Sequence, residues 1–325
     1  MDRAKAIGRT ECPVTVLMAV HNGGLFLRTA IDSVLAQTYR AFCFLIVDDA
    51  STDATREIVR AYDDARIELV YLERNVGQTA ALNIGLRHAA TPWIARMDAD
   101  DFSAPTRLEE QMGALERRPS LRCVGTFAWL FRNDPTVRER IVEKPVEYPA
   151  IRRELLESTP MIHGSITINR DDLLALGGYD ERYRYSADRD LYYRFLERHP
   201  AANVPKPLLG VRQHEYQGSG LRCSADESID IISRVLTLPH YTEEERTKLR
   251  ASLSWAYRFR ARCWGSERRY AEMLQDFVNA IRISPRAALG TFGGAALPVH
   301  LRHSIKRIWS SEHKGSLPRG TPPSC

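Results

Sequence analysis

The sequence carries an acidic cluster, Asp98-Ala99-Asp100-Asp101, directly after the apolar run Trp93–Met97. Two carboxylates separated by one residue at a strand end can place oxygens on one hard cation, and Mg²⁺ and Mn²⁺ prefer such ligands. A cation held there would neutralise a departing diphosphate. The alternative is a solvated acidic turn that caps the following helix. The position directly after an apolar strand favours the cation, so the sequence predicts a metal-binding cluster.

A second acidic pair, Asp48-Asp49, follows the apolar run Phe42–Val47. An acidic residue at the end of the second strand of a nucleotide-binding sheet often contacts a sugar hydroxyl or a base N–H. The alternative role is capping of the next helix, for which Asp53 and Thr52 also compete. The turn after the first strand, His21-Asn22-Gly23-Gly24-Leu25, contains no G-x-G-x-x-G motif, so we expect no dinucleotide cofactor.

These polar residues need elements that bring them together, and the first third of the sequence alternates strand and helix signals. Short continuous apolar runs are typical of strands buried on both faces, and segments with apolar residues at helical spacing separate them. This alternation predicts a doubly wound, mainly parallel α/β sheet flanked by helices, in which the carboxyl ends of the strands form one ligand-binding edge. The predicted strands are 14–20, 42–47, 67–71 and 93–97, and the predicted helices begin near 25, 53, 78 and 105.

The rest of the chain has a mixed middle part and a helical end. We predict strands at Cys123–Phe131 and His163–Ile168 and a helix at Asp188–Arg198. From about Ala225 the apolar pattern is helical, without a strand signal. We therefore expect a catalytic domain, a C-terminal helical extension and a proline-containing tail without fixed structure. The predicted boundaries are 1–222, 223–314 and 315–325.

The charge of the chain is unevenly distributed. The net charge is +5, but residues 251–325 contain 12 Lys and Arg against 4 Asp and Glu. A basic segment of this kind contacts an anionic surface or forms a solvated face. Because arginines at 258, 260, 262, 268 and 269 lie among Trp255, Tyr257, Phe259 and Trp264, we predict peripheral membrane contact through this region. The alternative is a helical hairpin that packs on the catalytic domain. We expect no nucleic-acid partner.

Targeting signals are missing from the sequence. No segment provides the roughly 20 apolar residues of a membrane-spanning helix, and Met1–Cys12 lacks the apolar centre of a signal peptide. The six cysteines are scattered without a C-x-x-C pair, and we interpret them as free thiols in a reducing compartment. These features predict a cytoplasmic protein that reaches, at most, the inner face of a membrane.

A series of motifs follows one another in a fixed order between about Pro13 and Gly220. They are VTVLMAVHN, SVLAQTY, FLIVDDASTD, NVGQTAALNIGL, MDADD, HGSITINRDDLLALGGYDERY, SADRDLYYRF and VRQHE. In this order they resemble the family 2 glycosyltransferases of the GT-A fold. The resemblance implies an inverting enzyme that moves a sugar from a nucleoside-diphosphate sugar, a UDP-sugar first, to a glycan or lipid-linked acceptor. The family's commonest setting is the synthesis of cell-surface polysaccharide or glycolipid.

The resemblance also implies roles for individual residues at the nucleotide. Asp49 would bind the base and Asp48 would support its loop, while Val20 and Asn22 would border the nucleotide. Arg74 is a candidate phosphate contact, although an exposed charge after a strand is the simpler interpretation. In the metal site, Asp98 and Asp100 would hold Mg²⁺ or Mn²⁺ and the diphosphate, and His214 would approach the metal.

On the acceptor side, the resemblance implies that Asp188 is the catalytic base. Asp101 and the residues Gly178, Tyr179 and Asp180 would border the donor sugar and the acceptor. The chain departs from the family around the base, where Ala187 and Arg189 replace an acidic or amide residue and an aromatic residue. Asp190 is therefore a rival for the base.

Two further interpretations remain open at this point. A sugar nucleotidyltransferase would need a basic phosphate loop after the first strand, and the turn there has no basic residue. A nucleotide-binding protein that has lost turnover is compatible with the departures at Ala187 and Arg189. The chain contains no Gln-x-x-Arg-Trp segment, which marks the processive polymer synthases, and this predicts the addition of single sugars.

Overall fold

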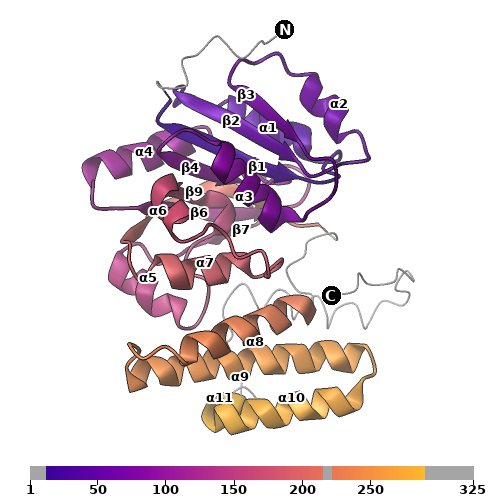
Figure 1. Ribbon diagram of the computed structural model, residues 1–325, viewed down its shortest axis with the longest axis vertical. Coiled ribbons are helices and arrows are strands. Elements are labelled where there is room, and N and C mark those ends of the chain that lie inside the picture. The colour runs from indigo at the N-terminus through magenta and orange to yellow at the C-terminus, as the bar shows by residue number, and fades with distance from the viewer. Residues whose placement is uncertain (1–11, 215–221, 290–325) are drawn as a thin grey trace. The chain divides into compact units, whose positions relative to one another are not determined.

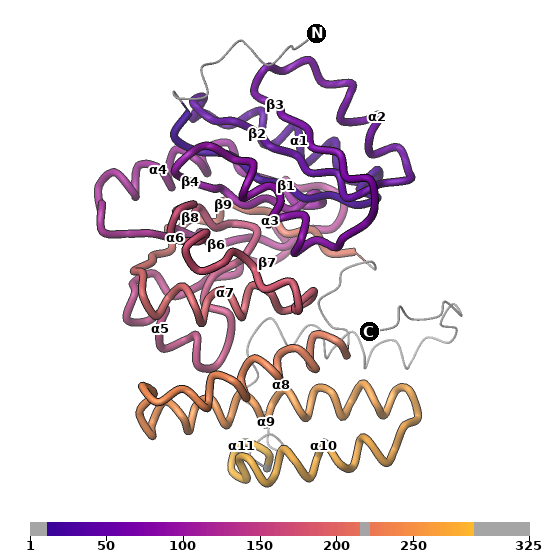
Figure 2. The backbone as a smooth tube through the Cα atoms, in the orientation of Figure 1, coloured from indigo at the N-terminus to yellow at the C-terminus, as the bar shows by residue number. Residues whose placement is uncertain are grey.

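The computed structural model describes residues 12–214 and 222–289, and the chain divides into two compact units (Figures 1 and 2). The first, which we call the sheet unit, consists of Met1–Leu155 and Thr159–Tyr216. The second, the helical unit, consists of Leu156–Ser158 and Gln217–Cys325. The domain boundaries predicted at 222 and 314 stay predictions, since the residues at and beyond them lie partly outside the described ranges.

The first half of the sheet unit confirms the predicted alternation. Strands β3, β2, β1 and β4 are parallel neighbours in that order. All seven residues of β1 are buried, as a continuous apolar run requires. The elements are β1 (Val14–Val20), α1 (Leu27–Leu35), β2 (Phe42–Asp48), α2 (Thr55–Arg60), β3 (Ile67–Tyr71), α3 (Gln78–His88) and β4 (Trp93–Met97).

The second half adds strands in both directions to the same sheet. After β4 the order continues through β8, β6, β9 and β5, with β7 paired to β6. Strand β8 is antiparallel to β4, whereas β9 runs parallel to β6. The strands are β5 (Phe102–Ser103), β6 (Cys123–Phe131), β7 (Arg140–Val142), β8 (Thr167–Asn169) and β9 (Ala201–Arg212), and the helices are α4 (Arg107–Arg117), α5 (Tyr148–Leu155), α6 (Arg170–Ala175) and α7 (Ala187–Phe195).

The predicted strand His163–Ile168 is wrong in its first half. Residues His163–Ser165 form a short 3₁₀ turn, η1, and only Thr167–Asn169 pair as a strand. The Ser165 hydroxyl donates to the carbonyl of Ile162 at 2.7 Å and accepts from the backbone N–H of Thr126 at 3.1 Å. A serine side chain that bonds to nearby backbone offers the chain an alternative to the ladder of a sheet.

The helical unit consists, within the described residues, of helices that follow one another along the chain. They are α8 (Arg222–Leu236), α9 (Glu243–Ser266), α10 (Tyr270–Ile283) and α11 (Pro285–Leu289). A capping box starts α9, because the side chains of Thr242 and Glu245 each accept from the other's backbone N–H. None of the described helices combines the length and apolar character that crossing a bilayer demands.

One prediction about the cysteines needs correction. Cys12, Cys43, Cys123 and Cys263 are free thiols, as expected. Cys223 in α8 is disulfide-bonded, so the interpretation of all six cysteines as free thiols is wrong.

Candidate active site

The loops after β1 and β2 are tied to each other at the carboxyl edge of the sheet. Asn22 takes a left-handed backbone conformation with φ 53°, which asparagine tolerates well. Its N–H donates to the Ser51 hydroxyl at 2.9 Å, and its side-chain oxygen accepts from the N–H of Thr52 at 2.9 Å. The N–H of Asp49 donates to the carbonyl of Val20 at 2.8 Å. The structure therefore brings Val20, Asn22 and the Asp48-Asp49 pair together.

The two aspartates after β2 organise different loops. Asp48 is buried, accepts from the N–H of Ser51 at 3.1 Å and forms an ion pair with Arg56 at 2.6 Å. Asp49 accepts from the N–H groups of Val76 and Gly77, one on each carboxylate oxygen, at 2.7 and 2.8 Å. Asp49 thus fixes the turn before α3, and each oxygen keeps a lone pair for a further donor.

Arg74, at the start of that turn, is exposed and lines a shallow hollow with Val76, Arg87 and Glu181. The structure therefore places Arg74 beside the segment that Asp49 holds. A direct phosphate contact of Arg74 stays a prediction.

The acidic cluster after β4 meets the end of β9. The Asp100 carboxylate contacts Nε2 of His214 at 2.8 Å, although the two residues are 114 positions apart. The Asp101 carboxylate accepts from the N–H of Arg212 at 3.0 Å, and the Arg212 guanidinium donates to the carbonyl of Asp100 at 2.9 Å. Asp98 forms an ion pair with Arg96, and the Gln78 amide donates to it at 3.3 Å. Three of the predicted metal-site residues therefore lie at one edge.

Buried arginines balance the charge of this acidic edge, and the sequence analysis overlooked two of them. Arg96 is 4% exposed and Arg107 is 1% exposed. Burial lowers the pKa of both guanidiniums, that of Arg107 to about 10. Burial and the neighbouring charge of Asp100 raise the pKa of Asp101 to about 8. An arginine inside the apolar strand WIARM was the available signal, because charged residues are rarely buried without a partner.

The donor set at this edge fits a divalent cation that shares its ligands with a substrate. Within residues 12–214 and 222–289, no three His, Cys, Asp or Glu side chains converge as a complete metal site. The paired Asp100 and His214 offer two ligands. A Cβ atom on Gly164 would lie 3.1 Å from carboxylate oxygens of both Asp98 and Asp101, so glycine keeps this space open. Mg²⁺ and Mn²⁺ commonly take one or two carboxylates and complete their shell with phosphate and water oxygens.

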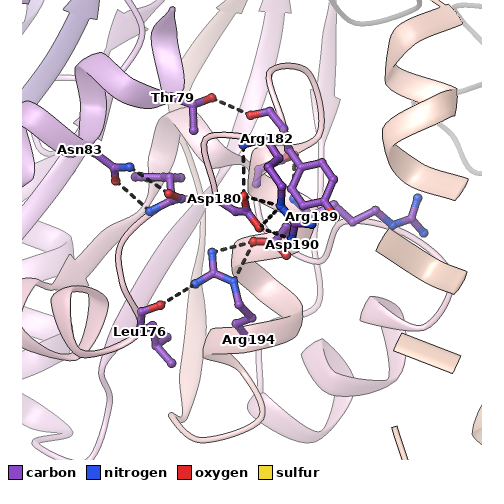
Figure 3. Close-up of polar contacts among 11 residues, drawn as sticks. Thr79, Asn83, Leu176, Asp180, Arg182, Arg189, Asp190 and Arg194 are labelled. Carbon is purple, nitrogen blue, oxygen red and sulfur yellow. Dashed lines mark hydrogen bonds and ion pairs between the residues drawn. The ribbon is translucent and has the colours of Figure 1, made fainter. Parts of the chain in front are cut away.

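The two candidate bases at the start of α7 have different surroundings. Asp188 is half-buried, its carboxylate accepts from the N–H of Arg189 at 2.8 Å, and burial raises its pKa. Asp190 is fully buried and forms an ion pair with Arg194 at 2.6 Å. Figure 3 shows Arg194 reaching from Asp190 to the carbonyl of Leu176, 3.1 Å away. The geometry therefore favours Asp188 over Asp190 as a group that can exchange a proton.

Arg96 connects the acidic edge to α7. Its charge acts on Asp100 and Asp101 of the acidic edge and on Asp188 of α7. It also acts on His163, whose pKa burial and this positive charge lower well below the usual range. The neutral His163 contacts the hydroxyl of Tyr179 at 2.9 Å. The buried Arg96 guanidinium is therefore an electrostatic link between the predicted base and the acidic edge.

The Gly177-Gly178 turn after α6 is held by α3. Both glycines have positive φ, 84° and 75°. The Asn83 amide accepts from the N–H of Tyr179 and donates to its carbonyl, both at 2.8 Å (Figure 3). Tyr179 is 5% exposed, and Asp180 is paired with Arg182, which lowers its pKa. Contacts of Gly178, Tyr179, Asp180 and Asp101 with a sugar stay predictions. The side chains of Tyr179, Asp180 and Asp101 each have a protein partner.

Comparison with known proteins adds two findings about sequence. A model of the family described as glycosyl transferase family 2 matches residues 15–177. A Bacillus subtilis (strain 168) protein named as the glycosyltransferase EpsE is 35% identical over 206 residues, which are 62% of this chain and 73% of that protein. The amylovoran biosynthesis glycosyltransferase AmsE of Erwinia amylovora is 29% identical over 189 residues, 57% of this chain and 70% of its own length.

Two solved structures share the fold at low sequence identity. Residues 1–349 of S. aureus TarS in complex with UDP-GlcNAc give a TM-score of 0.66 at 16% identity, over 85% of this chain and 82% of that one. The mannosyltransferase PcManGT from Pyrobaculum calidifontis, in complex with GDP-Man and Mn²⁺, gives 0.58 at 19% identity, over 94% and 83%.

Proposed function

The chain belongs to the glycosyl transferase family 2, and we propose that it transfers a single sugar, with inversion, from a nucleoside-diphosphate sugar to an acceptor hydroxyl. It is a glycosyltransferase with the GT-A fold. The observation that supports the proposal is that the buried Arg96, which pairs with Asp98, also acts electrostatically on Asp100, Asp101 and Asp188.

The donor would lie along the carboxyl edge of β1, β2 and β4. We assign the base to the loops that carry Asn22 and Asp49, with Arg74 as a phosphate contact. The ties between these loops keep them in register, so the nucleotide meets a preformed surface. We propose UDP as the nucleotide, and the likeness to a UDP-GlcNAc complex supports it; the GDP-Man complex makes GDP the next candidate to test.

The diphosphate would bind with Mg²⁺ or Mn²⁺ at the acidic edge. Asp100 and His214 would hold the ion, and Asp98 would join them once a diphosphate reorganises its pairing with Arg96. When bound, the ion neutralises the charge of the leaving diphosphate. Arg96 and Arg212 hold the acidic segment in place, so that the protein's own contribution is orientation and charge balance.

Asp188 would act as the base in a single displacement. It accepts the proton of the acceptor hydroxyl while that oxygen attacks the anomeric carbon, and the bond from this carbon to the diphosphate oxygen breaks. Attack opposite the leaving group inverts the anomeric configuration. The raised pKa of Asp188 supports this role, since a stronger base takes a proton more readily.

We propose a glycan or lipid-linked acceptor in the synthesis of a surface polysaccharide or glycolipid, with the reaction on the cytoplasmic side of a membrane. The name of the Erwinia relative, a protein of amylovoran biosynthesis, supports a polysaccharide pathway.

Calorimetric titration tests the donor site. UDP, GDP and dTDP are each titrated with and without Mn²⁺, and we expect one of them, UDP, to bind in a metal-dependent way. Asp100→Ala should weaken that binding by at least about 10-fold. Asp63→Ala is the matched control. This exposed aspartate lies before the amino end of β3, whereas the candidate site lies at the carboxyl ends of the strands.

Turnover distinguishes an enzyme from a binding protein. An intact site releases sugar slowly to water, so metal-dependent hydrolysis of the preferred UDP-sugar is expected from the wild type and not from Asp188→Asn. Tight nucleotide binding without any hydrolysis or transfer would favour the binding protein and overturn the proposed reaction.

A further inference from the structure

Helix α10 of the helical unit presents a stripe of exposed apolar side chains. Tyr270, Leu274, Val278 and Ile281 are 59%, 61%, 40% and 44% exposed. Their spacing of four, four and three residues places them on one face of the helix. We call these residues the α10 stripe. In the rest of the described chain, large exposed apolar side chains are scattered over the sheet unit and no other helix carries such a row.

The opposite face of α10 explains why the stripe points outward. Asp276 is 3% exposed and is held by the Arg260 guanidinium of α9 at 2.7 Å. Ala280 is fully buried, and the Ser254 hydroxyl donates to its carbonyl at 2.9 Å. Because these contacts fix the rotation of α10 against α9, the stripe cannot turn inward without the loss of a buried ion pair.

The charge around the stripe is positive. Each acidic residue between 251 and 289 has an arginine partner: Glu267 pairs with Arg222, Glu272 with Arg269 and Asp276 with Arg260. Four arginines of the same segment have no carboxylate partner among the described residues: Arg262, Arg268, Arg282 and Arg286.

Two of the unpaired arginines bracket the stripe. Arg268 lies two residues before Tyr270, and Arg282 directly follows Ile281. An antiparallel second copy of α10 would bring Arg268 of one chain next to Arg282 of the other, and like charges placed together oppose such pairing. A negatively charged surface has the complementary charge at both ends.

The aromatic face expected from the sequence is not available for this purpose. Phe259 is buried and stacks on Trp255 with ring centroids 5.4 Å apart, and Trp264 donates to Asp276 at 3.1 Å. Arg260 is engaged between Asp226 and Asp276. These residues hold α8, α9 and α10 together, so the surface that remains free is the α10 stripe.

We propose that the α10 stripe, with Arg268 and Arg282, docks on an anionic lipid surface. The helix lies in the plane of the interface, its apolar side chains enter the boundary of the acyl chains, and the arginines contact lipid phosphates. Docking would bring the enzyme to a lipid-linked acceptor, and this purpose rests on the proposed function. Docking itself is measured without turnover.

Co-sedimentation of the full chain with vesicles tests the proposal. The wild type is expected to sediment with phosphatidylglycerol–phosphatidylcholine vesicles at low ionic strength and to remain in the supernatant with phosphatidylcholine alone. The double variant Leu274→Asp/Val278→Asp should bind at least about 10-fold more weakly, because two inserted side chains are replaced by anions. Val137→Asp is the matched control, since this equally exposed valine lies in the sheet unit.

A charge-reversal variant separates the two parts of the surface. Arg268→Glu/Arg282→Glu should weaken binding by about 10-fold at low salt and much less at high salt, where electrostatic attraction is screened. Circular dichroism checks that each variant is folded, and the metal-dependent nucleotide titration checks that the donor site is unchanged. If the wild type binds vesicles but none of the nucleotides, the proposed function is refuted and the docking proposal still holds.

Three results would overturn the inference. The first is equal sedimentation of the wild type with neutral and anionic vesicles, or sedimentation with neither. The second is binding of the stripe variant as strong as that of Val137→Asp. The third is a dimer in sedimentation velocity that only the stripe variant loses. The last outcome would assign the stripe to a second copy of the chain.

Discussion

Two groups of aspartates and arginines, one in each unit, use the same residue types for different purposes: one holds helices together, and the other forms the candidate binding site. We call them the edge cluster and the helical cluster. The edge cluster consists of Asp98, Asp100, Asp101, Arg96, Arg107, Arg212 and His214, and the helical cluster consists of Asp226, Asp276, Arg222, Arg260 and Trp264.

In the helical cluster the polar atoms are matched almost one to one. Both oxygens of Asp276 accept from Arg260 at 2.7 Å, and Trp264 adds a third bond at 3.1 Å. Asp226 accepts from Arg260 at 2.8 Å and from Arg222 at 3.0 Å. These bonds raise the pKa of Arg260 above its usual value, so the folded state favours the charged form. The cluster joins three helices.

In the edge cluster some buried polar atoms lack hydrogen bonds, and one carboxylate has a raised pKa. Nε of Arg96 and Nε of Arg107 are buried without a hydrogen-bond partner. Asp101 is held where its ionised form is disfavoured, with its pKa raised to about 8. The two clusters therefore differ in their carboxylates: arginines pair those of the helical cluster, whereas burial disfavours the ionised form of Asp101 in the edge cluster.

The largest expected effect belongs to the helical cluster. Asp276→Asn removes the buried charge that pairs with the half-buried Arg260, and the cost of breaking a fully buried pair, about 3–5 kcal/mol, is the upper limit here. Urea unfolding followed by circular dichroism should show an earlier transition, while nucleotide binding under native conditions is unchanged. Glu272→Gln is the control, because this acid on the same helix pairs with Arg269 at the surface, where loss of an ion pair has little effect on stability. Equal effects of the two substitutions would refute the structural role of the helical cluster.

The next effect separates two aspartates of α7. Asp188→Asn should lower turnover by about 10²-fold or more with donor affinity retained, because only the base is lost. Asp190→Asn should instead lower stability, since it removes the buried carboxylate that pairs with the half-buried Arg194. Rates measured on folded protein decide the matter. If Asp190→Asn lost turnover and Asp188→Asn kept it, the assignment of the base would reverse.

The pH dependence follows from the raised pKa of Asp188. Turnover requires the ionised base, so kcat/KM should fall as the pH drops through that pKa. Stability has the opposite sign: the folded-state pKa exceeds the unfolded one, so the stabilisation from this group is complete below about 3.8 and is lost as pH rises through the folded-state value.

Asp188→Asn should therefore melt at a higher temperature than the wild type at neutral pH, while it loses activity. Thermal melts of both proteins across pH test this, with Asp180→Asn as the comparison. The pKa of Asp180 is lowered by Arg182, so that substitution should lower the melting temperature instead.

Part of the sheet could be predicted from the sequence alone. Strands β1, β3 and β4 begin and end as predicted, because continuous apolar runs between turn residues leave few alternatives. Strand β9 went unrecognised, since Pro205 and Pro207 interrupt its apolar pattern. The structure accommodates them where the register with β6 shifts, on either side of Phe127.

At the site, the sequence placed the acidic edge but not the groups that balance it. The Asp-x-Asp spacing and the strand before it are local, so they could be recognised. The pairing of Asp100 with His214 joins residues far apart in the chain, and only the motif order suggested it. The roles of Arg107 and Gly164 depend on packing between α4, η1 and β4, which no local pattern encodes.

The smallest expected effect concerns the turn beside the edge cluster, where geometry rather than charge is the constraint. Gly177 and Gly178 both have positive φ, so alanine at either position is strained by about 1 kcal/mol. A Cβ on Gly177 would meet nothing within 4 Å, whereas one on Gly178 would lie 2.5 Å from the Asn83 side-chain oxygen. Gly178→Ala must therefore displace the amide that holds Tyr179 and should cost about 1–2 kcal/mol more than Gly177→Ala.

Gly178→Ala should also raise the KM for the acceptor, which Gly177→Ala should leave unchanged. Equal unfolding midpoints and equal KM values for the two variants would show that the Asn83 clamp contributes nothing, and that the edge cluster is positioned by its arginines alone.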